Sequence, residues 1–205
     1  MKTFSPARRL LCALAFGIGL LGLQTTFALD APKTAGAPQV KFVTNMGEFV
    51  VEVYPDKAPK TAENFLQYVS DKHYEGTIFH RVIANFMIQG GGYDARYIER
   101  PTRAPVMHEG LEALSKGGPR NTVGTIAMAR TNAPHSATAQ FFINVVDNGF
   151  LDPSPQQPGY TVFGKVVSGM DVVNRIRAIP TGFGGPFPTD VPRTPVVIKS
   201  ATVLP

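Results

Sequence analysis

The sequence is almost free of cysteine, with one residue, Cys12, in a chain of 205. Cys12 lies within an apolar N-terminal run, and the residues before it lack the small-residue context of a lipid-modified cysteine. If that run is removed on export, the remaining chain has no thiol. Disulfides, thiolate metal sites and cysteine nucleophiles are then excluded together, and stability has to come from packing.

Charge is also sparse, at 17% of residues, while hydrophobic residues make up 43%. This balance provides too little charge for a disordered chain and enough apolar material for one globular core. The 20 glycines and 18 prolines follow no repeating period. We therefore interpret them as turn residues between many short strands.

Long apolar runs are confined to the N-terminus. Lys2, Arg8 and Arg9 precede an uncharged run at residues 10–23, which leads into small residues ending at Ala28. A basic start, a short apolar run and a small residue at the cleavage position are typical of a secretory signal peptide. The run is too short for a comfortable membrane span, although a retained membrane anchor is the alternative.

The export segment divides the chain into three predicted parts: a signal peptide at residues 1–28, a flexible lead at 29–38 and one folded domain at 39–205. Removal of the signal peptide takes away three positive charges and lowers the formal net charge from +5 to +2. A charge this small argues against nucleic-acid binding. We therefore expect a periplasmic protein that is monomeric and has no stable membrane association after cleavage.

Hydrophobic periodicity predicts two helices. The first begins near Pro59, and its buried face consists of residues at helical spacing, namely Ala62, Phe65, Leu66 and Val69. The second is predicted to start at Ser168, whose side chain caps the first turn. Its buried stripe is formed by Val172, Val173, Ile176 and Ile179.

Alternation of apolar and polar residues predicts a β-hairpin that turns at residues 45–47. Other β-branched and aromatic segments predict strands at residues 78–83, 86–89, 124–129, 141–146, 160–167 and 195–204. Many short strands with two separated helices predict a mainly β fold. We expect a closed or nearly closed antiparallel sheet with the helices over its ends.

Arg81 stands out within the predicted strand at residues 78–83. Strand alternation places Phe79, Arg81 and Ile83 on one face, so that a permanent charge stands between two large apolar groups. Local conflict of this kind is typical of a functional site. The alternative is a structural role, in which Arg81 pairs with a carboxylate at a sheet edge.

A second conflict appears at residues 140–145. Phe141, Ile143 and Val145 form an apolar core face, which leaves Gln140, Phe142 and Asn144 on the opposite face. A face with a large aromatic between two amides is poorly suited to solvent. It is well suited to line an apolar pocket whose amides orient a ligand. A partly buried surface aromatic is the alternative interpretation.

Other chemistries lack their sequence patterns. The histidines show no zinc-enzyme spacing, the glycines at residues 90–92 have no Lys-Ser or Lys-Thr after them, and Ser136 beside His135 lacks a nucleophile elbow. A metal site, a phosphate loop and a hydrolase are therefore not expected. The loop at residues 93–105 carries three arginines, which we interpret as a solvated surface.

Residues 79–83 (FHRVI) followed by 86–91 (FMIQGG) closely resemble the signature of the cyclophilins. The resemblance continues through further segments at residues 59–65, 124–130, 140–144, 150–152 and 160–164, and covers residues 38–205. With its export segment, the chain is most similar to the periplasmic cyclophilins of Gram-negative bacteria. The resemblance implies an eight-stranded antiparallel barrel capped by two helices, with a packed interior and a substrate groove on its outer wall.

The resemblance also implies a peptidyl-prolyl cis/trans isomerase that acts on proline-containing segments of exported proteins and needs no cofactor. Arg81 would be catalytic, donating to the prolyl nitrogen, with Gln89 as the neighbour that holds it. The groove would be lined by Phe86, Met87, Ala129, Gln140, Phe142, Phe150, Leu151 and Tyr160. The alternative function is a chaperone or adaptor that binds proline-containing segments, with incidental isomerase activity.

Three positions depart from the common eukaryotic pattern of this family. Phe150 stands where tryptophan is usual, Tyr160 where histidine is usual, and Arg130 where asparagine is usual. Proline binding should survive these changes. Cyclosporin binding is expected to be weak, because Phe150 cannot donate the hydrogen bond that an indole would supply.

Overall fold

The structure is a computed structural model that describes residues 36–205. The expected signal peptide, residues 1–28, lies outside the described residues, as does most of the expected flexible lead. Within the described part, no helix is long and apolar enough to cross a bilayer. The same residues contain no group of three His, Cys, Asp or Glu side chains placed to hold a metal ion.

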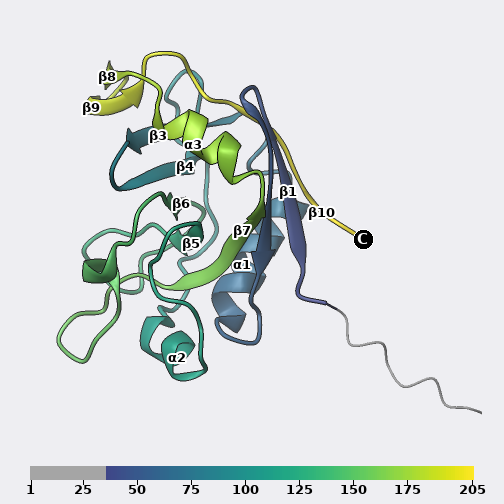
Figure 1. The fold of residues 1–205 in the computed structure, drawn as a ribbon, viewed down its shortest axis with the longest axis vertical. Coiled ribbons are helices and arrows are strands. Elements are labelled where there is room, and N and C mark those ends of the chain that lie inside the picture. The colour runs from purple at the N-terminus through teal and green to yellow at the C-terminus, as the bar shows by residue number, and fades with distance from the viewer. Residues whose placement is uncertain (1–35) are drawn as a thin grey trace, which may run out of the picture. The chain divides into compact units, whose positions relative to one another are not determined.

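Eight antiparallel strands form the main sheet, in the order β10-β1-β2-β7-β5-β6-β4-β3 (Figure 1). The strands are β1 Gln39–Thr44, β2 Gly47–Val53, β3 Thr77–Ile83, β4 Met87–Asp94, β5 Thr125–Met128, β6 Phe141–Asn144, β7 Val162–Ser168 and β10 Ile198–Val203. The expected hairpin is confirmed, because β1 and β2 pair directly across the turn. All six of the other predicted strands are present with shifted ends.

The two ends of this sheet meet. The Phe79 amide of β3 donates to the carbonyl of Val196 at 3.0 Å, and the Gly76 amide donates to the carbonyl of Ile198 in β10 at 2.7 Å. These bonds leave little unpaired edge, the usual means by which an antiparallel sheet avoids edge-to-edge association. The predicted fold class, a mainly β and nearly closed eight-stranded antiparallel barrel, is confirmed.

An aromatic cluster fills the barrel interior. The rings of Phe42 and Phe49 stack with centroids 4.9 Å apart, and Phe141 meets Phe65 and Tyr74 edge-on. All five rings are buried. Truncation of one such ring to alanine typically costs about 3–5 kcal/mol of stability. The interior is therefore a packed core, and a ligand site has to lie outside it.

The first helix, α1 Pro59–Ser70, begins at the predicted proline. No side chain of its own caps it; the carboxylate of the distant Glu109 accepts the backbone amides of Lys60 and Thr61 at 3.1 and 2.8 Å. Glu109 immediately precedes a short helix, α2 Gly110–Ser115, which the sequence analysis did not predict. The described residues thus contain three α-helices rather than the two expected.

The third helix, α3 Met170–Arg177, starts two residues later than predicted. The expected cap at Ser168 is wrong, because Ser168 ends β7 and the residue before the helix is Gly169. Gly169 has φ 79°, and a Cβ there would lie 2.4 Å from the Glu48 carbonyl oxygen. Only glycine fits this close approach of two backbones. Figure 1 shows α1 and α3 on opposite sides of the barrel.

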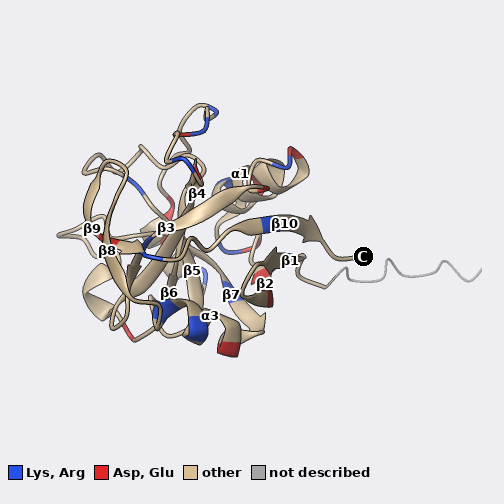
Figure 2. Ribbon diagram, turned by 90° about the horizontal axis from the view of Figure 1, so that it is seen from above, with Lys and Arg blue, Asp and Glu red and all other residues tan. Residues whose placement is uncertain are grey.

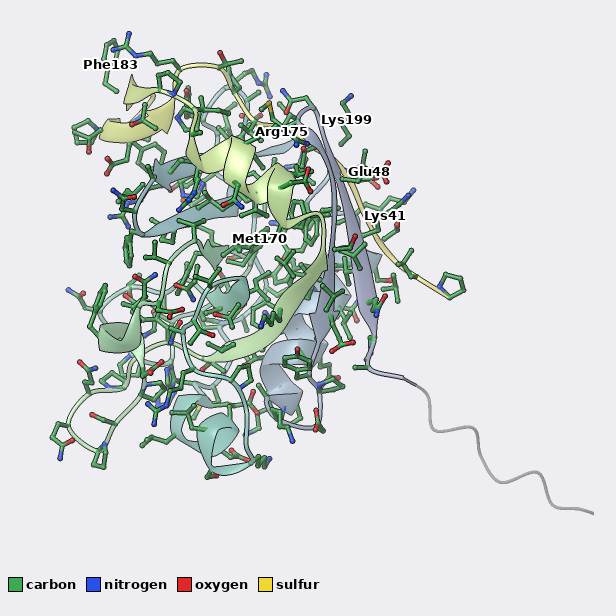
Figure 3. The ribbon with its side chains drawn as sticks, in the orientation of Figure 1. Lys41, Glu48, Met170, Arg175, Phe183 and Lys199 are labelled. Carbon is green, nitrogen blue, oxygen red and sulfur yellow. The ribbon has the colours of Figure 1, made fainter. Side chains whose placement is uncertain are left out.

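A two-stranded sheet that the sequence analysis missed lies beside β3 (Figure 1). It consists of β8 Thr181–Gly184 and β9 Phe187–Pro192. The ring of Phe187 stacks on His80 with centroids 5.2 Å apart and meets Tyr93 edge-on at 5.1 Å. These contacts fix the β8–β9 hairpin to the outer face of β3. In Figure 3, Phe183 of β8 projects away from the barrel.

Charged residues of both signs are interspersed around the domain (Figure 2). On the β1–β2 hairpin, for example, Lys41 and Glu48 form an ion pair of 3.4 Å (Figure 3). The three arginines in the loop at residues 93–105 each have a partner within the protein: Asp94 for Arg96, the His73 carbonyl for Arg100 and Asp71 for Arg103. Two of the three positive charges are thus paired with carboxylates, and the third arginine is hydrogen-bonded to a backbone carbonyl.

The buried imidazole of His80 makes the stability of the fold depend on pH. His80 is 2% exposed, and burial lowers its pKa from 6.5 to about 4, with the positive charge of Arg81 acting in the same direction. As the pH falls from about 6.5 to 4, the unfolded chain takes up this proton before the folded protein does. We expect the free energy of unfolding to fall by up to about 3 kcal/mol over this range.

Urea denaturation at pH 7 and pH 4 measures this loss. The variant His80→Phe keeps an aromatic ring against Phe187 and has no proton to take up, so its unfolding free energy should change less between the two pH values. His135→Phe, at an exposed position, serves as the control and should behave like the wild type. An equal pH-dependent loss in His80→Phe and the wild type would contradict the assignment.

Candidate active site

A β-bulge in β3 determines where Arg81 points. Phe79 lies opposite Gly90 of β4, yet Arg81 lies opposite Gln89, so His80 is an extra residue in β3. An extra residue reverses the alternation of side chains beyond it. Phe79 therefore faces the barrel core, while Arg81 faces outward.

The bulge corrects one expectation from the sequence. Phe79 and Val82 belong to the core, whereas Arg81 is exposed and Ile83 packs against a second apolar cluster on the outer wall. The prediction that Phe79, Arg81 and Ile83 share one face is therefore wrong for Phe79. Strict alternation could not show this, because the bulge depends on how β3 pairs with β4.

A cavity of about 380 Å³ opens on this outer wall. Its lining comes from β3, β4, β6 and the segments around residues 129, 151 and 160, and consists of Arg81, Phe86, Met87, Gln89, Ala129, Arg130, Phe142, Leu151 and Tyr160. The apolar members pack with Ala127 and Val162 in a cluster separate from the barrel core. The cavity is thus an apolar hollow with a polar rim.

The floor of the cavity is rigid and apolar. Met87 and Phe142 are 2% and 5% exposed, and the ring of Tyr160 meets Phe142 edge-on with centroids 5.4 Å apart. At the rim, Phe150 stacks on Phe86 with centroids 5.6 Å apart and remains largely exposed. Such a hollow suits a small apolar ring that enters from solvent.

The structure brings the ten expected site residues to one side of the barrel. Eight of them line the cavity. Gln140 lies in an adjoining hollow of about 220 Å³, which shares Gln89 and Ala129 with the cavity. Phe150 lies at the rim through its stacking on Phe86.

Two amides depart from the expected arrangement. The side chain of Gln89 lies opposite Arg81 across the β3–β4 pair, but its amide donates to the Oε1 atom of Gln140 at 2.9 Å. The polar partner of Arg81 is instead Asp190 of β9, with Nε and Oδ2 3.9 Å apart. Asn144, expected beside Phe142 as an orienting group, is fully buried and does not line the cavity.

Asn144 belongs to a buried hydrogen-bond network behind the cavity. Its amide donates to the Thr125 hydroxyl at 2.9 Å, and its carbonyl accepts the amide of Asn148 at 2.8 Å. Asn148 also donates to the backbone carbonyl of Phe86 at 2.9 Å. A fully bonded buried network is rigid, so it holds the Phe86 wall against the turn that carries Leu151.

Arg130 lines the cavity although the sequence analysis did not place it among the site residues. Its guanidinium lies over the Tyr160 ring, 4.6 Å from the centroid, and donates to the Gly159 carbonyl from Nε and Nη2 at 3.0 and 2.7 Å. The signal that could have identified it was its position next to Ala129. Arg130 holds Tyr160 in place against the cavity.

The side chains around the cavity suit binding and donation rather than proton transfer. Their polar groups are the guanidinium groups of Arg81 and Arg130 and the amides of Gln89 and Gln140, and these side-chain types do not act as general acids or bases. No carboxylate, histidine or serine lies in the lining of the cavity. The arrangement can hold an apolar ring and offer a permanently charged donor beside it.

Comparisons with known proteins agree on one family. Residues 39–203 match the family model described as "Cyclophilin type peptidyl-prolyl cis-trans isomerase/CLD". The chain is 52% identical over 167 residues to peptidyl-prolyl cis-trans isomerase B of Escherichia coli (strain K12), which covers 80% of this chain and 98% of that protein. It is 41% identical over 198 residues to peptidyl-prolyl cis-trans isomerase A of Dickeya dadantii (strain 3937), which covers 97% and 98%.

The fold is also found among solved structures. A cyclophilin-type peptidyl-prolyl cis-trans isomerase of Cryptosporidium parvum matches with a TM-score of 0.62 and 24% identity, over 82% of this chain and 98% of that chain. At 24% identity, this likeness shows the fold alone. The family model matches residues 39–203 and therefore includes the residues that form the outer-wall cavity. The chain belongs to the cyclophilin-type peptidyl-prolyl cis/trans isomerases.

Proposed function

We propose that this isomerase accelerates rotation about X-Pro bonds of exported proteins in the periplasm, and that Arg81 is its catalytic donor. The observation that carries the proposal is the position of Arg81 on the rim of an apolar cavity formed by Phe86, Met87, Phe142 and Leu151. A charged donor beside a slot for an apolar ring is what prolyl isomerisation requires.

The physical problem is the loss of amide resonance. Rotation about an X-Pro bond has a barrier of about 18–20 kcal/mol, so uncatalysed exchange takes about 10–100 s. As the bond twists, the prolyl nitrogen becomes pyramidal and gains a lone pair that neither planar ground state has. A donor at that nitrogen stabilises the transition state more than the ground states, which is the condition for catalysis.

Each remaining site residue has a role in this scheme. The proline ring occupies the apolar floor, between Phe86, Met87, Phe142 and Leu151, with Tyr160 and Phe150 at its sides. Gln140 and the backbone of Ala129 bind the residue before the proline. The Ala129 amide already donates to the Gln140 carbonyl at 3.0 Å, so the carbonyl of Ala129 is the group offered to substrate. Gln89, bonded to Gln140, fixes the amide that meets the peptide.

The proposal of export rests on the N-terminal sequence. Residues 2–28 have the composition of a signal peptide. The alignment with the Dickeya dadantii isomerase spans 198 residues, which is longer than the described part of this chain. That relative therefore shares part of the N-terminal segment. We infer a periplasmic monomer whose partners are proline-containing segments of exported proteins.

Replacement of the guanidinium tests the catalytic role. We expect Arg81→Ala to lower kcat/KM for a prolyl peptide by at least about tenfold, or about 1.4 kcal/mol of transition-state stabilisation. The fold should remain, because the Arg81 side chain is 46% exposed. Arg175→Ala, at an exposed arginine of α3, is the matched control. A folded Arg81→Ala protein with full activity would contradict the mechanism.

Binding of cyclosporin tests the rim of the groove. The wild type should bind weakly, and Phe150→Trp should bind roughly five- to tenfold more tightly, because the indole adds one hydrogen-bond donor. Phe150 is 67% exposed, so the larger ring has room. Titration calorimetry gives both dissociation constants. Phe183→Trp is the control, since Phe183 lies outside the groove. Equal affinities of all three proteins for cyclosporin would refute the expected effect of an indole at position 150.

The alternative function is a chaperone or adaptor that binds proline-containing segments, and the exposed Phe150 ring at the cavity rim favours some capture of unfolded chains. We expect instead that the protein does not suppress aggregation of an unfolded client that lacks proline, since its cavity suits one ring. Light scattering follows the aggregation, beside isomerisation of a short peptide. Strong suppression with no isomerisation would favour the chaperone.

A further inference from the structure

The guanidinium of Arg81 has one polar partner among residues 36–205, the carboxylate of Asp190. The Nε atom of Arg81 and the Oδ2 atom of Asp190 are 3.9 Å apart, and the two side chains are partly exposed. Gln89, the neighbour across the β3–β4 pair, uses its amide on Gln140. The polar group beside the Arg81 guanidinium therefore comes from β9, which lies outside the main sheet.

Asp190 belongs to the β8–β9 hairpin, which is fixed to the strand that carries Arg81. Phe187 of β9 stacks on His80, the residue immediately before Arg81. At the same end of the hairpin, where Gly184 pairs with Phe187, the ring of Tyr97 lies so close to Gly184 and Gly185 that a Cβ at either glycine would overlap it. The carboxylate and the guanidinium are thus carried by elements that are packed together.

The backbone at Asp190 is unusual. Asp190 has φ 67°, in the left-handed region that most side chains avoid and that aspartate and asparagine tolerate better than other residues. A backbone conformation of this kind persists only where its surroundings hold it, and such residues gather at functional sites. Among residues 36–205, the side chain that pairs with the Arg81 guanidinium thus belongs to a residue with this unusual backbone conformation.

We propose that Asp190 is a positioning residue for Arg81, an inference that rests on the proposed catalytic role of Arg81. The carboxylate meets the Nε side of the guanidinium and leaves the two terminal nitrogens free to face the cavity. At 3.9 Å the contact is an ion pair rather than a hydrogen bond. This ion pair restricts rotation of the planar Arg81 guanidinium and leaves its terminal N–H donors available to the substrate.

The test compares Asp190→Asn with three other proteins: the wild type, Asp171→Asn and Arg81→Ala. Asparagine keeps the size and the tolerance of positive φ and removes only the charge. Asp171 is a matched control, because it pairs with Arg175 at 2.7 Å on α3, away from the cavity. We expect Asp190→Asn to lower kcat for a prolyl peptide about three- to fivefold with little change in KM, and Asp171→Asn to leave both unchanged.

The double variant Arg81→Ala/Asp190→Asn separates positioning from a general structural effect. If Asp190 acts through Arg81, the double variant should be no slower than Arg81→Ala. The NMR signal of the Arg81 Nε–H group should shift in Asp190→Asn, because the carboxylate 3.9 Å from Nε is replaced by a neutral amide. Asp190→Gly, which accepts the same backbone conformation, repeats the comparison should the asparagine variant fail to fold.

The outcomes distinguish the two proposals. Full activity of Arg81→Ala would overturn the proposed catalytic role and the positioning role with it. Loss of activity in Arg81→Ala with full activity in Asp190→Asn would overturn the positioning role alone. A further loss in the double variant, equal to the loss in Asp190→Asn by itself, would show that Asp190 acts on the fold and not through Arg81.

Discussion

The site depends on one irregularity of strand pairing, the extra residue at His80 in β3. Without it, the alternation that buries Phe79 would also direct Arg81 along the same inward-facing row, into a core that has no partner for a charge. With it, Phe79 and Val82 fill the barrel while Arg81 stands on the outer wall. One inserted residue thus lets a single strand serve both a packed core and a polar site.

The barrel and the groove have separate supports. The aromatic cluster inside the barrel sets the spacing of the strands, and the smaller cluster around Phe142 and Met87 forms the floor of the cavity. Behind that floor, Asn144 and Asn148 hold the wall and the neighbouring turn by buried hydrogen bonds. On the other side of Arg81, the β8–β9 hairpin carries Asp190. Arg81, the proposed donor, therefore lies between the wall of the cavity and the β8–β9 hairpin.

Much of the barrel could be predicted from the sequence because its signals are local. Pro59 at the start of α1 and the turn at residues 45–47 are of this kind, and both are confirmed. The six-residue helix α2 is too short to show a period, and the β8–β9 hairpin is rich in glycine and proline and depends on the contact of Phe187 with His80. The groove residues were predicted through family resemblance, whereas periodicity indicated only Arg81 and the face formed by Gln140, Phe142 and Asn144. Neither signal could reveal the bulge, which depends on the register of β3 against β4, or Asp190, which is far from Arg81 in the sequence.

In the proposed mechanism, the Arg81 guanidinium faces the nitrogen of a proline bound in the apolar cavity. A crystal structure of the protein with a short X-Pro peptide is the decisive measurement. We expect the proline ring to lie on Phe142 and Met87, with a terminal nitrogen of Arg81 within about 3.5 Å of the prolyl nitrogen. A proline bound elsewhere, or an Arg81 side chain turned away from the bound ring, would rule this mechanism out.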